Sequence, residues 1–96
     1  MLVIKNPILR KNQLFIALLN NNSSIIGYYD SKDDDNIIAT NVYRYAINTD
    51  INVLWYSVPI PGIDPRKFVS INTSTIVMLS SPNEELANDF LRFLEN

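Results

Sequence analysis

Apolar residues at the spacing of one helical face mark the C-terminal part of the chain. They occur in the order Leu86, Phe90, Phe93 and Leu94, with Ala87 and Leu91 beside them. This spacing predicts an amphipathic helix. Ser81 precedes it as the expected N-cap and Glu84 completes a capping box. The preceding run, Thr75 to Leu79, is short and rich in β-branched residues, which predicts a strand covered on both faces.

Four earlier segments have the composition of strands. Gln13 to Leu19 and Ser24 to Tyr29 are separated by a polar break of Asn and Ser, and together they predict a β-hairpin. Ile51 to Val58 predicts a further strand, and Phe68 to Asn72 an extended segment. Leu2 to Lys5 is expected to form a short edge strand.

The segment from Ile37 to Thr49 fits two periodicities. As a helix it would present one face made of Ile38, Val42, Tyr45 and Ala46. As a strand it would alternate Tyr43, Tyr45 and Ile47 against Val42, Arg44 and Ala46. The β-branched and aromatic content favours the strand, whereas the acidic start and the length favour the helix. We assign the helix and keep the strand as the alternative.

These assignments predict one domain over residues 1–96 with the order β-β-α-β-β-α. The expected fold class is α/β (α+β), with a single mixed β-sheet of about four to five strands and two helices. The strands on either side of the first helix should run parallel. Two helices are too few to cover both faces of strands as apolar as those around Phe15, Leu54 and Val77. We therefore expect a sheet face or an edge strand to contact a second protein.

The composition supports association and excludes several kinds of chemistry. The chain is 47% hydrophobic and 19% charged, and this low share of charge favours self-association. It contains neither cysteine nor histidine, which removes the usual nucleophile, proton shuttle and metal ligands. A Ser or Thr nucleophile would lack its usual base. We therefore expect no cofactor and no enzymatic activity.

The distribution of charge and apolar residues also bears on location. No stretch of about 20 apolar residues is present, and the first charge follows the first apolar run, unlike the order in a signal peptide. The net charge of −2 gives no general attraction to nucleic acid or to acidic membranes. We expect a soluble, cytoplasmic protein without a membrane partner.

An acidic segment provides the candidate metal ligands Asp30, Asp33, Asp34 and Asp35. Clustered carboxylates can bind Mg²⁺ or Ca²⁺, but the segment lacks the glycine and the glutamate that an EF-hand loop requires. A solvated turn that caps a helix explains the same residues, and we favour that interpretation over a metal site.

The segment from Pro59 to Lys67 is the candidate for partner binding. Its prolines and glycine predict a rigid loop, and rigid loops lose little entropy on binding. Two basic residues at its end are suited to an acidic partner. The candidate partner-binding residues are Arg66, Lys67, Pro61, Gly62 and Trp55. Aromatic residues in strands, Trp55 among them, more often serve packing.

The function expected first is that of a small non-enzymatic interaction protein, either a homodimer or a subunit of a larger assembly. The alternative is a nucleic-acid-associated accessory factor, in which dimerisation joins Arg66 and Lys67, or Arg10 and Lys11, into one basic stripe. A divalent-metal-dependent enzyme that uses the acidic turn is the third hypothesis.

Overall fold

Six strands and one C-terminal helix make up the described part of the chain. The computed structural model describes residues 9–48, 52–57, 64 and 66–95. The elements are β1 (Leu14–Leu19), β2 (Ser24–Asp33), β3 (Asn36–Asn48), β4 (Asn52–Ser57), β5 (Val69–Asn72), the 3-10 turn η1 (Thr73–Thr75), β6 (Ile76–Ser80) and α1 (Glu84–Glu95).

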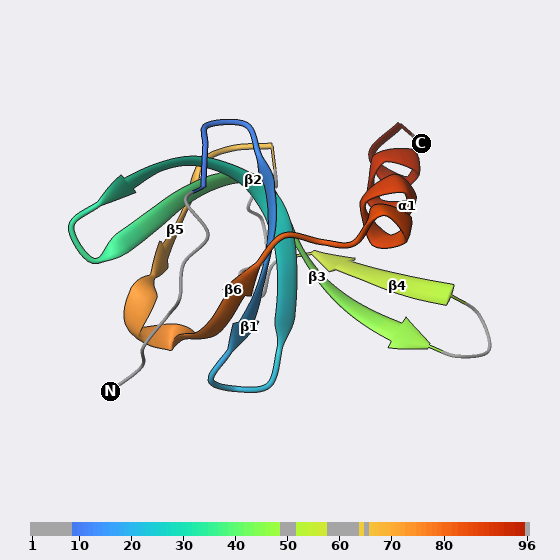
Figure 1. Cartoon of the computed structure of the whole chain (residues 1–96), viewed down its shortest axis with the longest axis horizontal. Helices are drawn as coiled ribbons and strands as arrows, with labels where there is room; N and C mark the ends of the chain where they lie inside the picture. Colours follow the sequence, from blue (N-terminus) through green and yellow to red (C-terminus); the bar gives the residue numbers. More distant parts are fainter. Residues whose placement is uncertain (1–8, 49–51, 58–63, 65, 96) are drawn as a thin grey trace.

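The sheet is antiparallel throughout and strongly curled. Its strand order is β4-β3-β2-β1-β6, and β5 also pairs with β3. The long strand β3 holds two neighbours in succession, because Asn36–Ala39 pair with β5 and Tyr43–Asn48 pair with β4. The two ends of the sheet therefore separate. Figure 1 shows β5 and β6 on one side, and the two-stranded ribbon of β3 and β4 extending to the other side beside α1.

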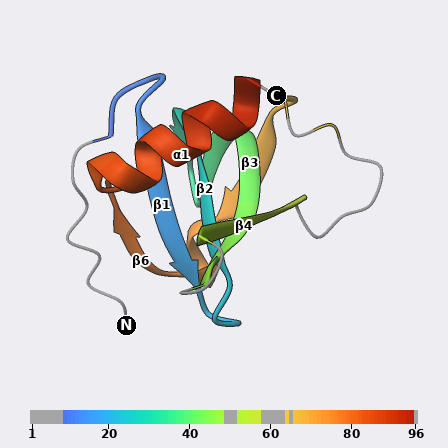
Figure 2. The ribbon, with the colours of Figure 1, turned by 90° about the vertical axis from the view of Figure 1, so that its right-hand side faces the viewer.

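Each face of this sheet has its own hydrophobic core. We call the face enclosed by the curl the inner face, and its core consists of Phe15, Ala17, Ile25, Ile37, Ala39, Val42, Ile76 and Leu79. The outer face is covered by α1, which lies across the strands in Figure 2. The core beneath α1 consists of Ile26, Leu86 and Phe90 with partly buried aromatic and aliphatic neighbours. Successive residues of a strand point to opposite faces, so Ile25 and Ile26 contribute to different cores.

A bulge lets β2 and β3 bend between the two halves of the sheet. The register shifts between Ile26 and Tyr28, where Gly27 faces two residues of β3, and Asn41 there has a φ of 53°. A Cβ on Gly27 would lie 3.0 Å from Cγ2 of Val42. Glycine therefore permits the close approach of β2 and β3 that the bend requires.

The predicted fold class is wrong in its second helix and in its mixed sheet. Of the segment from Ile37 to Thr49, assigned to a helix, residues 37–48 form most of β3 and Thr49 lies outside the described residues; all strand pairings among the described residues are antiparallel. The order in the described residues is six strands followed by one α-helix. The aspartates do not cap a helix: Asp30 and Asp33 lie in β2, and Asp34, with a φ of 46°, and Asp35 form the turn into β3. The strand alternative, which places Tyr43 and Tyr45 on one face of the strand and Val42 on the other, is correct.

The other predicted elements are confirmed where the structure describes them, with bounds that agree within one or two residues except for β2, which continues four residues beyond the predicted end at Tyr29. The N-terminal hairpin is β1 and β2, the strand after Ile51 is β4, and the extended segment after Phe68 is β5. The strand before the helix is β6, although Thr75 belongs to η1. The strand predicted for Leu2 to Lys5 lies outside the described residues.

The C-terminal helix is confirmed, with a different N-cap. Leu86 and Phe90 are buried as predicted, whereas Leu91 is exposed. The side-chain Oδ1 of Asn83 accepts a hydrogen bond of 2.8 Å from the backbone N–H of Leu86, so Asn83 and not Ser81 is the N-cap. This helix is too short and too polar to cross a membrane, and no other helix in the described residues could do so.

Replacing the N-cap should weaken the attachment of α1. We expect Asn83→Ala to lower the free energy of unfolding by about 1 kcal/mol, because a backbone donor of the first turn loses its partner. Urea denaturation provides the measurement. Ser81→Ala is the matched control and should change stability by only a few tenths of that amount; the reverse ranking would restore Ser81 as the cap.

Candidate interaction surfaces

The strand β6 forms an edge of the sheet that carries apolar side chains into solvent. It pairs with β1, and no second neighbour is present among the described strands. The register shift between Leu18 and Leu19 lets two consecutive residues of β6 face outward, so Val77 is 40% exposed and Met78 60% exposed. The prediction of a strand covered on both faces is therefore wrong for β6. An edge without charge or proline is a template for pairing with another chain.

A mainly apolar groove adjoins this edge. It has a volume of about 210 Å³ and is lined by Ile16, Ala17, Leu18, Ser24, Tyr45, Met78 and Ser80. The strand register aligns part of this lining, because Leu18 lies opposite both Met78 and Ser24, and Ser24 lies opposite Tyr45. The exposed apolar surface therefore continues from β6 towards β3.

A second cavity, which we call the notch, lies where β2 begins. It has a volume of about 400 Å³ and is lined by Asn22, Ser23, Ser24, Arg44, Tyr45, Ala46 and Tyr56. The first residue of β2, Ser24, pairs with Tyr45, whereas β3 continues to Asn48. The end of β3 is therefore paired with β4 alone within the described residues.

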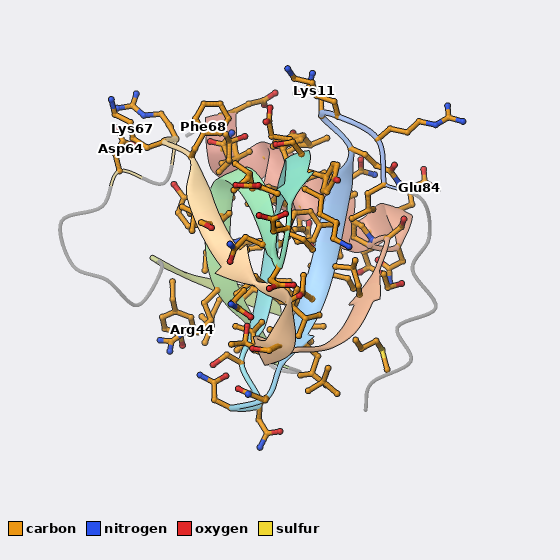
Figure 3. All side chains as sticks on the ribbon, turned by 90° about the vertical axis from the view of Figure 1, so that its left-hand side faces the viewer. Lys11, Arg44, Asp64, Lys67, Phe68 and Glu84 are labelled. Atoms are coloured by element: carbon orange, nitrogen blue, oxygen red, sulfur yellow. The ribbon has the colours of Figure 1, made fainter. Side chains whose placement is uncertain are left out.

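Arg44 is the one charged side chain among the described residues that line the notch. It lies opposite Tyr56 in the β3–β4 pairing, and its guanidinium carbon is 5.0 Å from the centroid of the Tyr56 ring. This distance is within the range of a cation–π contact. Figure 3 shows Arg44 at the lower part of the molecule, far from the labelled Lys11 and Lys67.

Tyr45 lines both the notch and the apolar groove, as does Ser24. Burial raises the pKa of the Tyr45 hydroxyl, and a hydrogen bond with the Ser24 side chain partly offsets this effect. The phenol therefore stays neutral at physiological pH. The Tyr45 hydroxyl is therefore a polar but uncharged group at both cavities.

The predicted partner-binding residues do not form one surface in the described part of the chain. Nε and Nη2 of Arg66 donate to the Asp64 carboxylate at 3.1 and 3.0 Å, and these bonds lower the pKa of Asp64. Lys67 is exposed at the upper end of the molecule in Figure 3, next to the exposed ring of Phe68. Pro61 and Gly62 lie outside the described residues.

Trp55, the aromatic candidate, is a packing residue. Its ring centroid lies 5.3 Å from that of Phe90 and 5.3 Å from that of Phe93, both on α1. The side chain is half-buried beneath the helix. It therefore joins α1 to the ribbon of β3 and β4, and the aromatic residue exposed near it is Tyr56 on the opposite face of β4.

The acidic segment comprises the last residues of β2 and the turn into β3. Asp30 accepts a hydrogen bond from the Ser31 hydroxyl and lies 3.7 Å from Nζ of Lys11. The other three candidates are the exposed residues Asp33, Asp34 and Asp35. The described residues contain no group of three or more carboxylates placed to hold a metal ion. Asp34 and Asp35 form the turn between β2 and β3.

Neither a family model nor a curated protein matches this chain.

Two residues of the candidate surfaces were not predicted from the sequence: Arg44 as part of a cavity, and Met78 as an exposed apolar side chain. The strand alternative for residues 37–49 already placed Arg44 on the side opposite Tyr45. Combining it with an antiparallel pairing to the next strand would have brought Arg44 to Tyr56.

Proposed function

We propose that this chain is a small, non-enzymatic interaction protein of the cytoplasm that self-associates as a homodimer through β6. The observation that carries the proposal is the uncharged edge of β6, with Val77 and Met78 exposed beside an apolar groove. Burying these side chains would stabilise a contact by about 25 cal/mol for each Å² of apolar surface removed from water.

A second copy of the chain suits this edge particularly well. Two β6 strands that pair antiparallel about a twofold axis present the same patch to each other and satisfy the unpaired backbone groups of both edges. Such pairing brings no like charges together, since Ile76–Ser80 carries no charged residue. A strand from a different protein is the other possible occupant, as expected for a subunit of a larger assembly.

The other two hypotheses have less support. Lys11 and Arg66, two of the proposed nucleic-acid contacts, already pair with Asp30 and Asp64. Nucleic-acid binding depends on several free cations along one surface, and Figure 3 shows Arg44 far from Lys67. The metal-dependent enzyme lacks a suitable group of carboxylates among the described residues.

The homodimer is tested by Met78→Lys. The wild type should have twice the monomer mass of 11.0 kDa at micromolar concentration, and Met78→Lys should shift it towards the monomer. Antiparallel pairing would bring two lysines close together, and charged residues on edge strands oppose such pairing. Size-exclusion chromatography with multi-angle light scattering, over a range of concentrations, measures the mass.

Leu91→Lys is the matched control, because Leu91 is 41% exposed on α1 and receives the same charge. It should leave the mass unchanged, and circular dichroism should show that both variants fold. A wild type that remains monomeric into the high micromolar range would refute the homodimer. Equal dissociation by both variants would show that the contact does not involve β6.

A further inference from the structure

We infer that the notch binds an acidic peptide segment, whose carboxylate contacts Arg44 and whose backbone extends along β3 beyond Tyr45, on the side where no described strand pairs with it. The inference goes beyond dimerisation. The notch lies at the β3–β4 side of the sheet, whereas β2 and β1 separate β6 from β3 in the strand order. It concerns a second, different partner.

The charge of the notch favours an anion. The chain has ten acidic residues and a net charge of −2, yet the described residues that line the notch include no carboxylate and one cation, Arg44. No ion pair involves Arg44 within the described part of the chain. A partner that brings a carboxylate would therefore meet a positive charge that the described residues do not neutralise.

The contact with Tyr56 prepares Arg44 for a carboxylate. A guanidinium group held over an aromatic ring keeps the N–H donors at its edge free. Those donors match the two oxygens of a carboxylate in a bidentate pair. The 5.0 Å contact with the ring thus limits the motion of the Arg44 side chain without occupying the group that would bind.

The backbone beside Arg44 favours an extended peptide. Ala46 and Ile47 lie beyond the point where β2 begins, and the described strands pair with them only on the β4 side. Ile47 is 71% exposed. An added segment of about three residues, some 10 Å long, would lie beside Ala46 and Ile47 on the side where no described strand pairs with them. The polar side chains of Asn22 and Ser23 lie at its end.

The same features disfavour nucleic acid as the ligand. A phosphate would also pair with Arg44, but binding to a nucleic-acid backbone requires several such contacts. The described lining of the notch offers one cation, and its volume of about 400 Å³ is that of a site for a small ligand or a short segment of chain. A peptide adds backbone hydrogen bonds to the single charge pair, and a nucleic acid does not.

Titration of the ¹⁵N-labelled protein with the peptide acetyl-Glu-Val-Glu-Val-amide tests this inference by NMR. We expect shifts of the Arg44 Nε–H and of the backbone amides of Ser23, Ala46 and Ile47. The probe acetyl-Gln-Val-Gln-Val-amide should bind at least tenfold more weakly, because it lacks the charge. Arg44→Gln should reduce binding of the acidic probe by a similar factor, and Arg44→Lys should lie in between.

Arg66→Gln is the matched control, since it removes the same charge elsewhere and should leave the affinity unchanged. The titration is repeated with Met78→Lys, so that failure of the dimer and failure of the peptide site are separate results. Absence of shifts at millimolar peptide, equal binding of both probes, or equal weakening by Arg66→Gln would overturn the inference. Tighter, strongly salt-dependent binding of a ten-residue oligothymidylate would overturn it in favour of nucleic acid.

Discussion

Phe90→Ala should lower the free energy of unfolding by about 3–5 kcal/mol, the range found for truncating a buried Phe. Phe90 is a residue of α1 and is fully buried between the helix and the sheet. Its ring lies 6.0 Å from that of Tyr43 and 5.3 Å from that of Trp55, between centroids. The rigid strands below limit how far these neighbours can move into the space left by the ring. The loss should therefore include both the transfer energy and the energy of the residual cavity.

Urea denaturation at one fixed protein concentration measures this loss, because a dimer makes stability depend on concentration. Trp55 is the only tryptophan of the chain, and its contact with Phe90 should make the native emission spectrum of Phe90→Ala differ from that of the wild type. Leu91→Ala, at the next position on the exposed side of α1, should cost well under 1 kcal/mol. Similar losses for both variants would contradict the packing of α1 on the sheet.

Phe15→Ala should have an effect of the same size, about 3–5 kcal/mol, in the other core. Phe15 is fully buried on the inner face, opposite Gly27 of β2. Its core neighbours include Ala17 and Ala39, whose small side chains cannot reach into the vacated space. The curl of the sheet holds the surrounding strands in place, so collapse of the cavity should be limited.

Phe68→Ala is the matched control for Phe15→Ala, because it removes the same ring at an exposed position. It should leave the midpoint of urea denaturation nearly unchanged. The native fluorescence of Trp55 distinguishes the two cores: Phe15→Ala should leave it unaltered, since Phe15 and Trp55 belong to different clusters. A spectral change equal to that of Phe90→Ala would show that the two cores are not separate.

The elements specified by local chemistry were predictable from the sequence. The C-terminal helix combines a regular apolar stripe with a polar start rich in capping residues, and both signals are contained within the segment. Its N-cap was misplaced because Ser81 and Asn83 are both good caps, and only the backbone geometry selects Asn83. The first hairpin was equally clear, since two β-rich runs flank a short polar break.

The second helix was mispredicted because its signals depend on distant partners. The aspartates before Asn36 are favoured both at helix starts and in tight turns, and the following residues fit both periodicities. Pairing of β3 with three other strands decides between the two. Such tertiary contacts override local propensity, and no single segment of the sequence contains them.

The candidate surfaces were less accessible to prediction than the fold. A need for an external contact was inferred from apolar strands that two helices cannot cover. In the structure the apolar surface left exposed is a different one. The curled sheet buries its own inner face, and β6 remains as the exposed apolar edge. Edge position is a property of strand order, which composition does not encode. The notch depends in the same way on where β2 begins relative to β3.

The division of neighbouring residues between two cores has a consequence for tolerance to insertions and deletions. Moving β2 by one residue would turn Ile25 outward and Ile26 inward and so disrupt both cores at once. In a strand with one face in solvent, the same shift would disrupt only one core. Changes of chain length are therefore confined to the turns at residues 20–23 and 34–35, and β2 between them keeps a fixed length.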